Sequence, residues 1–251
     1  MRTEEEATLI RPGERLDDLQ RAGLRILQRQ DGFRFGTDAV LLADFATPKK
    51  GERICDMGTG TGVLPLLMAA RSEETMFDAF ELQPEVADMA SRSVRFNGLG
   101  DRIRVYNADC REAAAIIGHE VCHLVVTNPP YTARGAGLVS PAQTRALSRS
   151  GEDCSLEEWM AACGRVLRNG GRLCCVFPAA RLLQLCDAMR GARLEPKRLR
   201  LVAAHADSAP KLVLLEALKG GRPGLHILPM LLTHTSDGGF TQEMRRIYGE
   251  L

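Results

Sequence analysis

Short apolar runs alternate along most of this chain with segments in which apolar positions recur every three or four residues. Runs of the first kind predict buried β-strands, and segments of the second kind predict amphipathic helices. The strands are expected at Arg53–Met57, Phe77–Leu82, Ile103–Asn107, Leu124–Thr127, Arg172–Phe177, Arg198–Ala203 and Lys211–Ala217. The helices are expected at Val63–Arg71, Glu85–Asn97, Arg111–Ile117, Leu156–Leu167 and Ala180–Met189.

This alternation predicts an α/β fold, with a parallel sheet and helices on both of its faces. The last two strands differ, because Ala206–Pro210 between them is too short for a crossover helix. They are therefore expected to pair as an antiparallel hairpin. The expected sheet has seven strands, mostly parallel, with one antiparallel strand. Asn97-Gly98 and Asn169-Gly170-Gly171 are typical of helix C-termini and predict the ends of two helices.

Two short segments ahead of this core predict a small N-terminal β-hairpin. Leu24–Gln28 and Phe33–Phe35 flank a Gln-Asp-Gly turn signal. A helix is then expected over Ala39–Phe45, with Thr37 or Asp38 as its N-cap. We divide the chain into an N-terminal extension (1–35) with the hairpin, a core (36–220) and a C-terminal extension (221–251) packed on the core.

Composition narrows the classes of function. The chain has 251 residues, 45% of them hydrophobic and 26% charged, which suits one large globular domain. A net charge of +1 provides no overall basic field, so a nucleic-acid surface would have to be local. The longest apolar runs are shorter than the roughly 18 residues that span a bilayer, and the acidic MRTEEE start is unlike a signal peptide. We therefore expect a cytoplasmic protein without a membrane partner.

Eight cysteines raise the question of a metal site or disulfides. The sequence contains no Cys-x-x-Cys pair and no cluster of His and Cys with zinc spacing. Most of the cysteines lie among small apolar residues, where a thiol packs as a small hydrophobic side chain. We expect reduced, structural thiols and no metal.

A glycine-rich segment follows the first core strand. Asp56 and Met57 end that strand, and Gly58, Thr59, Gly60, Thr61 and Gly62 follow it. Glycines allow the backbone to approach a ligand closely, and the N-terminus of the next helix lies behind them. An acid two residues before the first glycine repels a pyrophosphate but attracts an ammonium group. The pattern disfavours NAD and favours S-adenosylmethionine, whose amino-acid arm carries an ammonium group.

The next two strands also end in acids. Glu81, followed by Leu82, is placed to accept hydrogen bonds from a ribose diol, although it could also be a solvated acid at a strand end. Asp109 follows the third strand. It could accept from the amino group of a bound adenine or cap the helix that begins near Arg111, and both interpretations stay open.

The fourth strand runs into Thr127-Asn128-Pro129-Pro130-Tyr131. The lone pair of an exocyclic amine is delocalised into its ring, and two acceptors aimed at its protons would expose that lone pair. The side-chain oxygen of Asn128 and the backbone carbonyl of Pro129 are candidates for these acceptors. Pro130 stiffens the carbonyl, and Tyr131 could stack on a flipped planar group. The alternative is a simple proline turn.

Together these residues resemble the amino-methyltransferases that carry an Asn-Pro-Pro-aromatic signature. The implied fold is the Rossmann-like class I methyltransferase fold, whose sheet contains one antiparallel strand. Segments 33–43, 81–85, 194–198 and 220–223 are similar to the bacterial tRNA (adenine-N6) methyltransferase family, and this similarity runs from about Asp17 to Tyr248. Members of that family often carry other residues at the positions of Ser150 and Phe177.

The family resemblance implies methylation of an adenosine beside the anticodon of a valine tRNA, with S-adenosylmethionine as cofactor. The implied partner is the anticodon stem-loop, and nothing in the sequence demands more than a monomer. The expected catalytic residues are Asn128, Pro129, Pro130 and Tyr131. The expected cofactor site comprises Thr37, Asp38, Asp56, Gly58, Thr59, Gly60, Gly62, Glu81, Leu82, Asp109 and Asn128.

Three alternatives remain. The first is glutamine methylation of a release factor, because an amide nitrogen poses the same chemical problem. The enzymes that catalyse it carry a helical domain ahead of the catalytic core, and the about 35 residues before Gly36 are too few for such a domain. The second is methylation of a guanine amine in ribosomal RNA, and the enzymes that catalyse it usually have Phe at the position of Tyr131. A non-catalytic scaffold that binds cofactor or RNA would not need Asp56, Glu81 and Asn128 together. For RNA contacts, we expect arginines of 134–149 and of 190–200 to meet phosphates.

Overall fold

A computed structural model describes residues 9–31, 36–129 and 154–250 of the chain. Phe33–Phe35, Pro130, Tyr131 and the arginine-bearing segment 134–149 lie outside the described residues, and so does Ser150.

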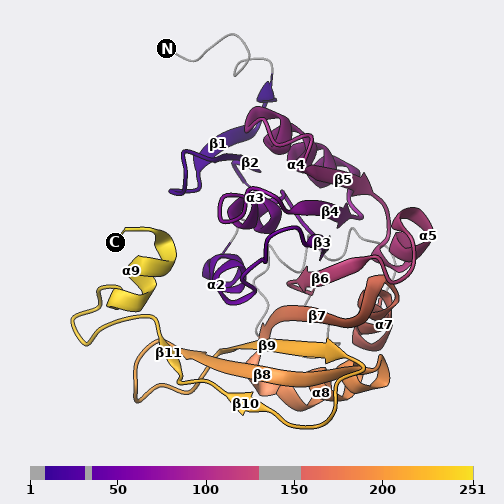
Figure 1. Ribbon diagram of the computed structural model, residues 1–251. Helices are drawn as coiled ribbons and strands as arrows, with labels where there is room; N and C mark the ends of the chain where they lie inside the picture. Colours follow the sequence, from indigo (N-terminus) through magenta and orange to yellow (C-terminus); the bar gives the residue numbers. More distant parts are fainter. Residues whose placement is uncertain (1–8, 32–35, 130–153, 251) are drawn as a thin grey trace.

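Nine strands of the described residues form one sheet (Figure 1). Its order is β10-β8-β9-β7-β6-β3-β4-β5, and β11 pairs with β8 beyond that path. The strands are β3 (Arg53–Met57), β4 (Met76–Glu81), β5 (Ile103–Asn107), β6 (Cys122–Thr127), β7 (Leu167–Pro178), β8 (Leu194–Ala203), β9 (Leu212–Lys219), β10 (His226–Ile227) and β11 (Leu231–Leu232). Only β9 is antiparallel to its neighbours, β7 and β8. The predicted mostly parallel sheet with one antiparallel strand is confirmed.

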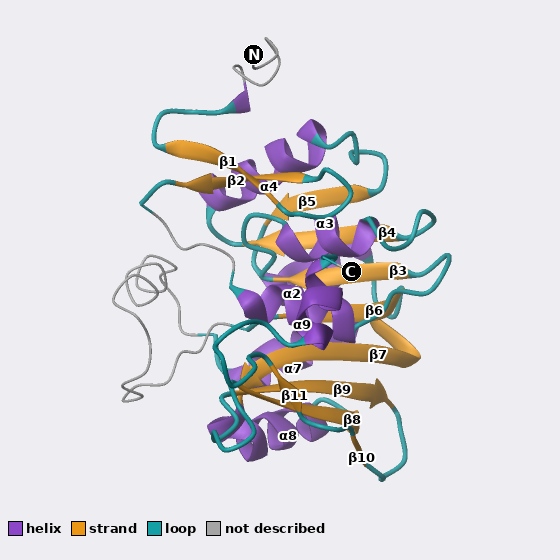
Figure 2. Cartoon of the chain, turned by 90° about the vertical axis from the view of Figure 1, so that its left-hand side faces the viewer, coloured by secondary structure: helices purple, strands orange, loops and turns teal. Residues whose placement is uncertain are grey.

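Helices lie on both faces of this sheet (Figures 1 and 2). One apolar cluster joins a face of the sheet to α2, α3, α4 and α9, and a second cluster joins the other face to α5, α7 and α8. The helices are α2 (Thr37–Phe45), α3 (Val63–Ala69), α4 (Pro84–Phe96), α5 (Ala113–Ile117), α7 (Leu156–Val166), α8 (Leu182–Gly191) and α9 (Gln242–Tyr248), with 3-10 turns η1 (Cys110–Glu112) and η2 (Ala179–Arg181).

The predicted N-terminal β-hairpin is present. The expected strand near Leu24–Gln28 is β2 (Arg25–Arg29), which pairs with the upstream segment β1 (Glu14–Asp18). The expected partner, Phe33–Phe35, lies outside the described residues. The β1 sequence Glu-Arg-Leu-Asp-Asp has no apolar alternation that would reveal a strand. Helix α4 holds the hairpin instead: Arg92 pairs with Glu14 at 2.7 Å, and the Ser93 hydroxyl accepts from the backbone N–H of Leu27.

The expected count of seven strands in the main sheet was too low. The additional strands, β10 and β11, have two residues each and come from the segment after residue 220. Both pair in parallel with β8 at the edge of the sheet, so this segment covers an edge that would otherwise be open. Runs of two residues leave no periodic signal in a sequence.

The predicted helix end at Asn97-Gly98 is confirmed, with Asn97 as C-cap and Gly98 at φ +65°. The one at Asn169-Gly170 was wrong, because α7 ends at Val166 and passes directly into β7.

All eight cysteines are free thiols, as expected, and six of them are buried. No helix in the described part of the chain is long and apolar enough to cross a bilayer.

Candidate functional site

The carboxyl ends of four neighbouring parallel strands meet at one edge of the sheet. Met57 on β3 lies opposite Phe80 on β4 and Thr127 on β6, and Glu81 on β4 lies opposite Asn107 on β5. Ligands of open α/β sheets bind outside this edge. The sequence-predicted residues of all four strands therefore come to the same place.

Asp56 carries a buried carboxylate near the end of β3. Its side chain is completely shielded from solvent, and neither oxygen accepts a hydrogen bond among the described residues. Burial raises the pKa of Asp56 to about 7; the nearby Thr59 hydroxyl opposes this rise, and the charge of Glu81 adds to it. The Thr59 hydroxyl is buried and also lacks a hydrogen bond of normal geometry. A buried, unpaired carboxylate is costly unless a cation completes it.

The glycine loop after β3 is held by β4. The backbone N–H groups of Gly58 and Thr59 both donate to the carbonyl of Phe80, at 3.0 and 2.8 Å. Gly58, Gly60 and Gly62 all have positive φ (+76°, +58° and +90°), which explains glycine at each of these positions. A Cβ at Gly60 would meet nothing within 4 Å, so this part of the loop has open space beside it.

Glu81 fastens the same loop through its side chain. One carboxylate oxygen accepts from the N–H of Gly60 at 3.0 Å, and the other accepts from the N–H of Gln83 at 2.9 Å. Burial raises the pKa of Glu81, and these backbone donors oppose the rise. Glu81 is 8% exposed, whereas Leu82 beside it is 43% exposed. An acid and an exposed apolar surface thus lie next to each other at the end of β4.

Asp109 acts as a helix cap, one of the two interpretations left open by its position in the sequence. Its side chain accepts from the backbone N–H of Arg111 at 2.8 Å at the start of η1. It also pairs with the Arg111 guanidinium at 2.6 Å, and this hydrogen bond lowers the pKa of Asp109.

The N-terminus of α2 meets the end of β6 through Asp38 and Asn128. The Asn128 side-chain nitrogen donates to Asp38 Oδ2 at 2.8 Å. A carboxylate can only accept, so the contact fixes which end of the amide faces Asp38. Asn128 is half-buried, and Pro129 after it is buried.

The expectation that Thr37 or Asp38 caps α2 was wrong. Gly36 occupies the N-cap position, and no side chain caps it. Asp38 lies in the first turn instead, where Oδ1 accepts from the N–H of Ala39 and Oδ2 accepts from Asn128. The Thr37 hydroxyl bonds with the hydroxyl of Tyr248 on α9 at 3.1 Å. These contacts connect α2 to β6 and to the C-terminal helix.

Trp159 supports the site but is not among the sequence-predicted residues. Its indole N–H donates to the Thr127 hydroxyl at 2.9 Å, and that hydroxyl donates to the carbonyl of Met57 at 2.8 Å. A Cβ on Gly58 would lie 3.0 Å from the Trp159 ring. Trp159 is the only tryptophan of the chain. This single occurrence was the one hint in the sequence that Trp159 has a specific role, but the sequence does not reveal what the ring contacts.

The expected basic stretch of residues 190–200 does not form one surface. Arg190 lies on α8 and pairs with Glu195, whereas Arg198 and Arg200 on β8 pair with Glu216 and Glu243. Helix α8 packs on one face of the sheet, and Glu243 belongs to α9 on the opposite face.

The residues at this edge fit S-adenosylmethionine. The orphaned carboxylate of Asp56 suits an ammonium group, the open space at Gly60 allows close backbone approach, and exposed Leu82 offers an apolar face to a planar ring. Among the described residues, no group of three His, Cys, Asp or Glu side chains could hold a metal ion.

Comparison with known proteins places these features in context. Residues 30–190 match the model of the methyltransferase small domain. The tRNA1(Val) (adenine(37)-N6)-methyltransferase of Erwinia tasmaniensis is 32% identical over 208 residues, which cover 81% of this chain and 82% of that protein. The protein of the same name from Parabacteroides distasonis is 31% identical over 183 residues, covering 73% and 76%.

Solved structures agree in fold. A crystal structure of a predicted O-methyltransferase from Agrobacterium tumefaciens has a TM-score of 0.69 and 26% identity, covering 84% of this chain and 95% of that one. A geranyl diphosphate methyltransferase in complex with S-adenosylmethionine has a TM-score of 0.52 and 17% identity, covering 72% and 84%; this likeness concerns the fold alone.

Proposed function

This chain belongs to the methyltransferase small domain family and to the family of tRNA1(Val) (adenine(37)-N6)-methyltransferases, and we propose that it methylates the exocyclic amine of an adenosine in tRNA. The observation that carries the proposal is the meeting of two features at one sheet edge. One is the unpaired carboxylate of Asp56 below the glycine loop, and the other is the oriented amide of Asn128.

S-adenosylmethionine, when bound, supplies an electrophilic methyl group on a sulfonium sulfur. Asp56 would pair with its ammonium group, and Glu81 would accept from its ribose hydroxyls. Leu82 would cover its adenine ring and Asp109 would accept from the adenine amino group. The remaining residues of the proposed cofactor site would surround these groups: Thr37, Asp38, Gly58, Thr59, Gly60, Gly62 and Asn128.

The chain's own contribution to chemistry lies in two acceptors for the target amine. The side-chain oxygen of Asn128 and the backbone carbonyl of Pro129 accept hydrogen bonds from the two N–H groups of the amine, which draws the nitrogen towards tetrahedral geometry and exposes its lone pair. Asp38 keeps the Asn128 amide oriented with its nitrogen away from the substrate. Pro130 stiffens the Pro129 carbonyl, and Tyr131 stacks on the flipped base. The surplus proton of the product passes to water.

The proposed substrate follows from the relatives, whose name specifies adenine 37 of a valine tRNA. We assign the anticodon stem-loop as the partner, a monomer as the working unit and the cytoplasm as the location. The divisions 1–35, 36–220 and 221–251 are the proposed extension, catalytic core and second extension. Glutamine and guanine remain the rival acceptors for the methyl group.

A labelling experiment tests this function. The protein is incubated with labelled S-adenosylmethionine and either bulk tRNA or a release factor, and the modified residue is identified by mass spectrometry. We expect N6-methyladenosine in valine tRNA. Label in a glutamine or a guanine would contradict the proposal. Asn128→Ala should lower the rate of transfer by on the order of a hundredfold while cofactor affinity stays near normal.

A further inference from the structure

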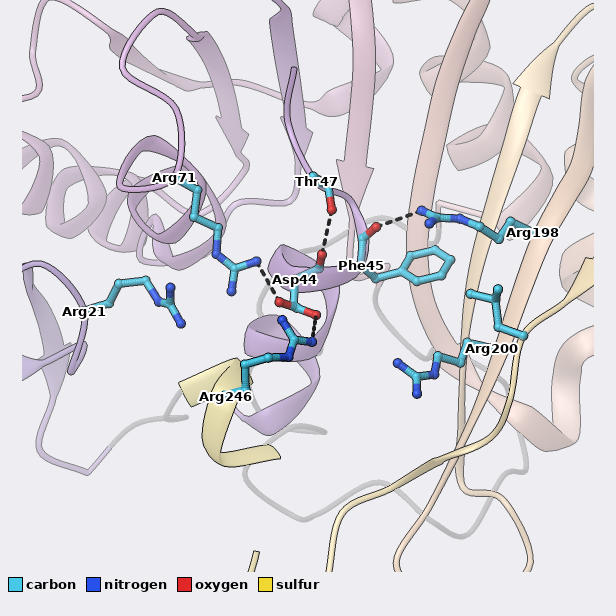
Figure 3. A pocket seen from close by; sticks show the side chains of 9 residues that line it. Arg21, Asp44, Phe45, Thr47, Arg71, Arg198, Arg200 and Arg246 are labelled. Carbon is cyan, nitrogen blue, oxygen red and sulfur yellow. Dashed lines mark hydrogen bonds and ion pairs between the residues drawn. The ribbon is translucent and has the colours of Figure 1, made fainter. Parts of the chain in front are cut away.

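A second site lies at the other end of α2 from Asp38. It is an open pocket of about 500 Å³ between the ends of α2 and α3, strand β8 and helix α9 (Figure 3). Asp44, Phe45, Thr47 and Leu228 contribute to its wall. The other lining residues are all arginines: Arg21, Arg71, Arg198, Arg200 and Arg246. We call this the arginine pocket.

The arginine pocket holds more cations than its acids neutralise. Asp44 is the acid among the lining residues, and it is shared by Arg71 at 3.0 Å and Arg246 at 3.5 Å. Arg198 and Arg200 reach Glu216 and Glu243, outside the lining, at 3.0 and 2.7 Å. Five guanidinium groups thus face three carboxylates, and Arg172 also draws on Glu216.

Two donors of these arginines have no acceptor among the described residues. The Nε atoms of Arg71 and Arg198 are buried and make no hydrogen bond among the described residues. Arg21 donates to the backbone carbonyl of Ile247 at 2.6 Å and has no acidic partner in the described part of the chain. Burial lowers the pKa of Arg71, Asp44 opposes this, and repulsion from Arg21 and Arg246 lowers it further. The cations therefore crowd one another.

A structural role explains part of this arrangement. Arg71 donates to the carbonyl of Ala43, and Arg198 donates to the carbonyl of Phe45, so both satisfy the C-terminal end of α2. Arg198 also stacks over the Phe45 ring at 4.2 Å. This role does not extend to Arg246, whose side chain is 57% exposed, or to Arg21. Their guanidinium groups point towards the pocket around Asp44 (Figure 3).

We propose that the arginine pocket binds a backbone phosphate of the substrate RNA. Arginine presents paired donors that match phosphate oxygens, and an added anion relieves the repulsion among Arg21, Arg71 and Arg246. Helix α2 connects this pocket to the methyl-transfer edge, with Asp38 in its first turn and Asp44 in its last. Nine helical residues span about 13 Å, so a bound RNA strand needs to reach only a short way from the methylated base to place a phosphate in the pocket. The inference rests on the proposed function for the identity of the RNA.

Arg246→Gln is the test variant, because it removes one exposed cation of the arginine pocket. Arg11→Gln is the matched control, since Arg11 is 59% exposed, also pairs with an acid (Asp88 on α4), and does not line the arginine pocket. Binding of unmodified valine tRNA is measured at several salt concentrations. In Arg246→Gln the slope of log affinity against log salt should fall by about 0.7–0.9, with roughly threefold to tenfold weaker binding at 0.15 M salt. Arg11→Gln should match wild type, and both variants should keep wild-type cofactor affinity and unfolding temperature.

The outcomes separate this inference from the proposed function. If wild-type protein methylates tRNA but Arg246→Gln binds it with unchanged affinity and slope, the RNA site is overturned. The same holds if Arg11→Gln weakens binding equally. Calorimetry with inorganic phosphate, at ionic strength matched by chloride, tests for a free anion. Phosphate binding lost in Arg246→Gln, with tRNA binding unchanged, would assign the pocket to a small anion and overturn the proposal. If wild type does not act on tRNA at all, the proposed function fails and the RNA site fails with it.

Discussion

Asp38 and Asn128 are 90 residues apart in the chain and 2.8 Å apart in the structure, where the Asn128 amide donates to the Asp38 carboxylate. This contact gives Asp38 a positioning role beside the amide that we propose to be catalytic. It also makes the two residues interdependent, because each supplies what the other cannot: one accepts and the other donates.

The first prediction follows from that interdependence. Asn128→Asp alone would place two carboxylates in contact, and like charges at that distance repel. We expect a loss of roughly a hundredfold in methyl transfer at pH 8. Asp38→Asn with Asn128→Asp reverses donor and acceptor, restores one hydrogen bond, and should recover at least about tenfold of the loss. Single-turnover rates on tRNA measure this. A double variant no faster than Asn128→Asp would contradict the positioning role.

The second prediction concerns Asp56 and pH. Its pKa rises from 3.8 to about 7 on folding, so the folded chain without cofactor binds a proton there that the unfolded chain has released. The stability of the cofactor-free protein should therefore fall as pH rises from about 4 to 7. Asp56→Asn removes this dependence and should be more stable than wild type at pH 8, by up to about 4 kcal/mol. Denaturant unfolding at pH 5 and pH 8 measures both.

Cofactor affinity should respond to pH in the opposite direction. The ammonium group pairs with the ionised carboxylate, so the affinity of wild type for the cofactor should rise between pH 6 and 8. At pH 6.5, binding of the cofactor should release a proton from Asp56. Asp56→Asn should bind weakly at every pH in this range. Calorimetry in two buffers of different ionisation enthalpy detects the proton. Equal affinities of the two proteins at pH 8 would exclude Asp56 from the cofactor site.

The third prediction compares two glycines of the loop. An alanine at Gly58 or at Gly60 must adopt positive φ, which costs about 1–2 kcal/mol in either case. At Gly58 the new Cβ would also meet the Trp159 ring at 3.0 Å, whereas at Gly60 it meets nothing. Gly58→Ala should thus lower the free energy of unfolding by more than Gly60→Ala, by about 1–3 kcal/mol. Equal losses would show that Trp159 moves aside without cost.

The parallel core could be predicted from the sequence because buried strands appear as apolar runs, and acids or amides mark their ends. Asp56, Glu81 and Asn128 come from three different strands, but the parallel topology alone brings their ends to one edge. The β1 strand could not be predicted, because its pairing depends on Arg92 and Ser93 of α4, over 60 residues away. The support of Gly58 by Trp159 is equally non-local, and spacing along a chain carries no information about it.

The last prediction addresses the two roles of Glu81. It holds the loop through the N–H of Gly60, and we propose that it also accepts from the cofactor ribose. Glu81→Ala should weaken cofactor binding by roughly 1–3 kcal/mol, while Glu85→Ala, an exposed acid four residues on, should not. An S-adenosylhomocysteine analogue without the ribose 2′-hydroxyl separates the roles. If the carboxylate contacts the ribose, wild type should bind the analogue more weakly than the parent, and Glu81→Ala should bind the two equally. If the penalty for the missing hydroxyl is the same in both proteins, Glu81 only anchors the loop, and the ribose contact must be abandoned.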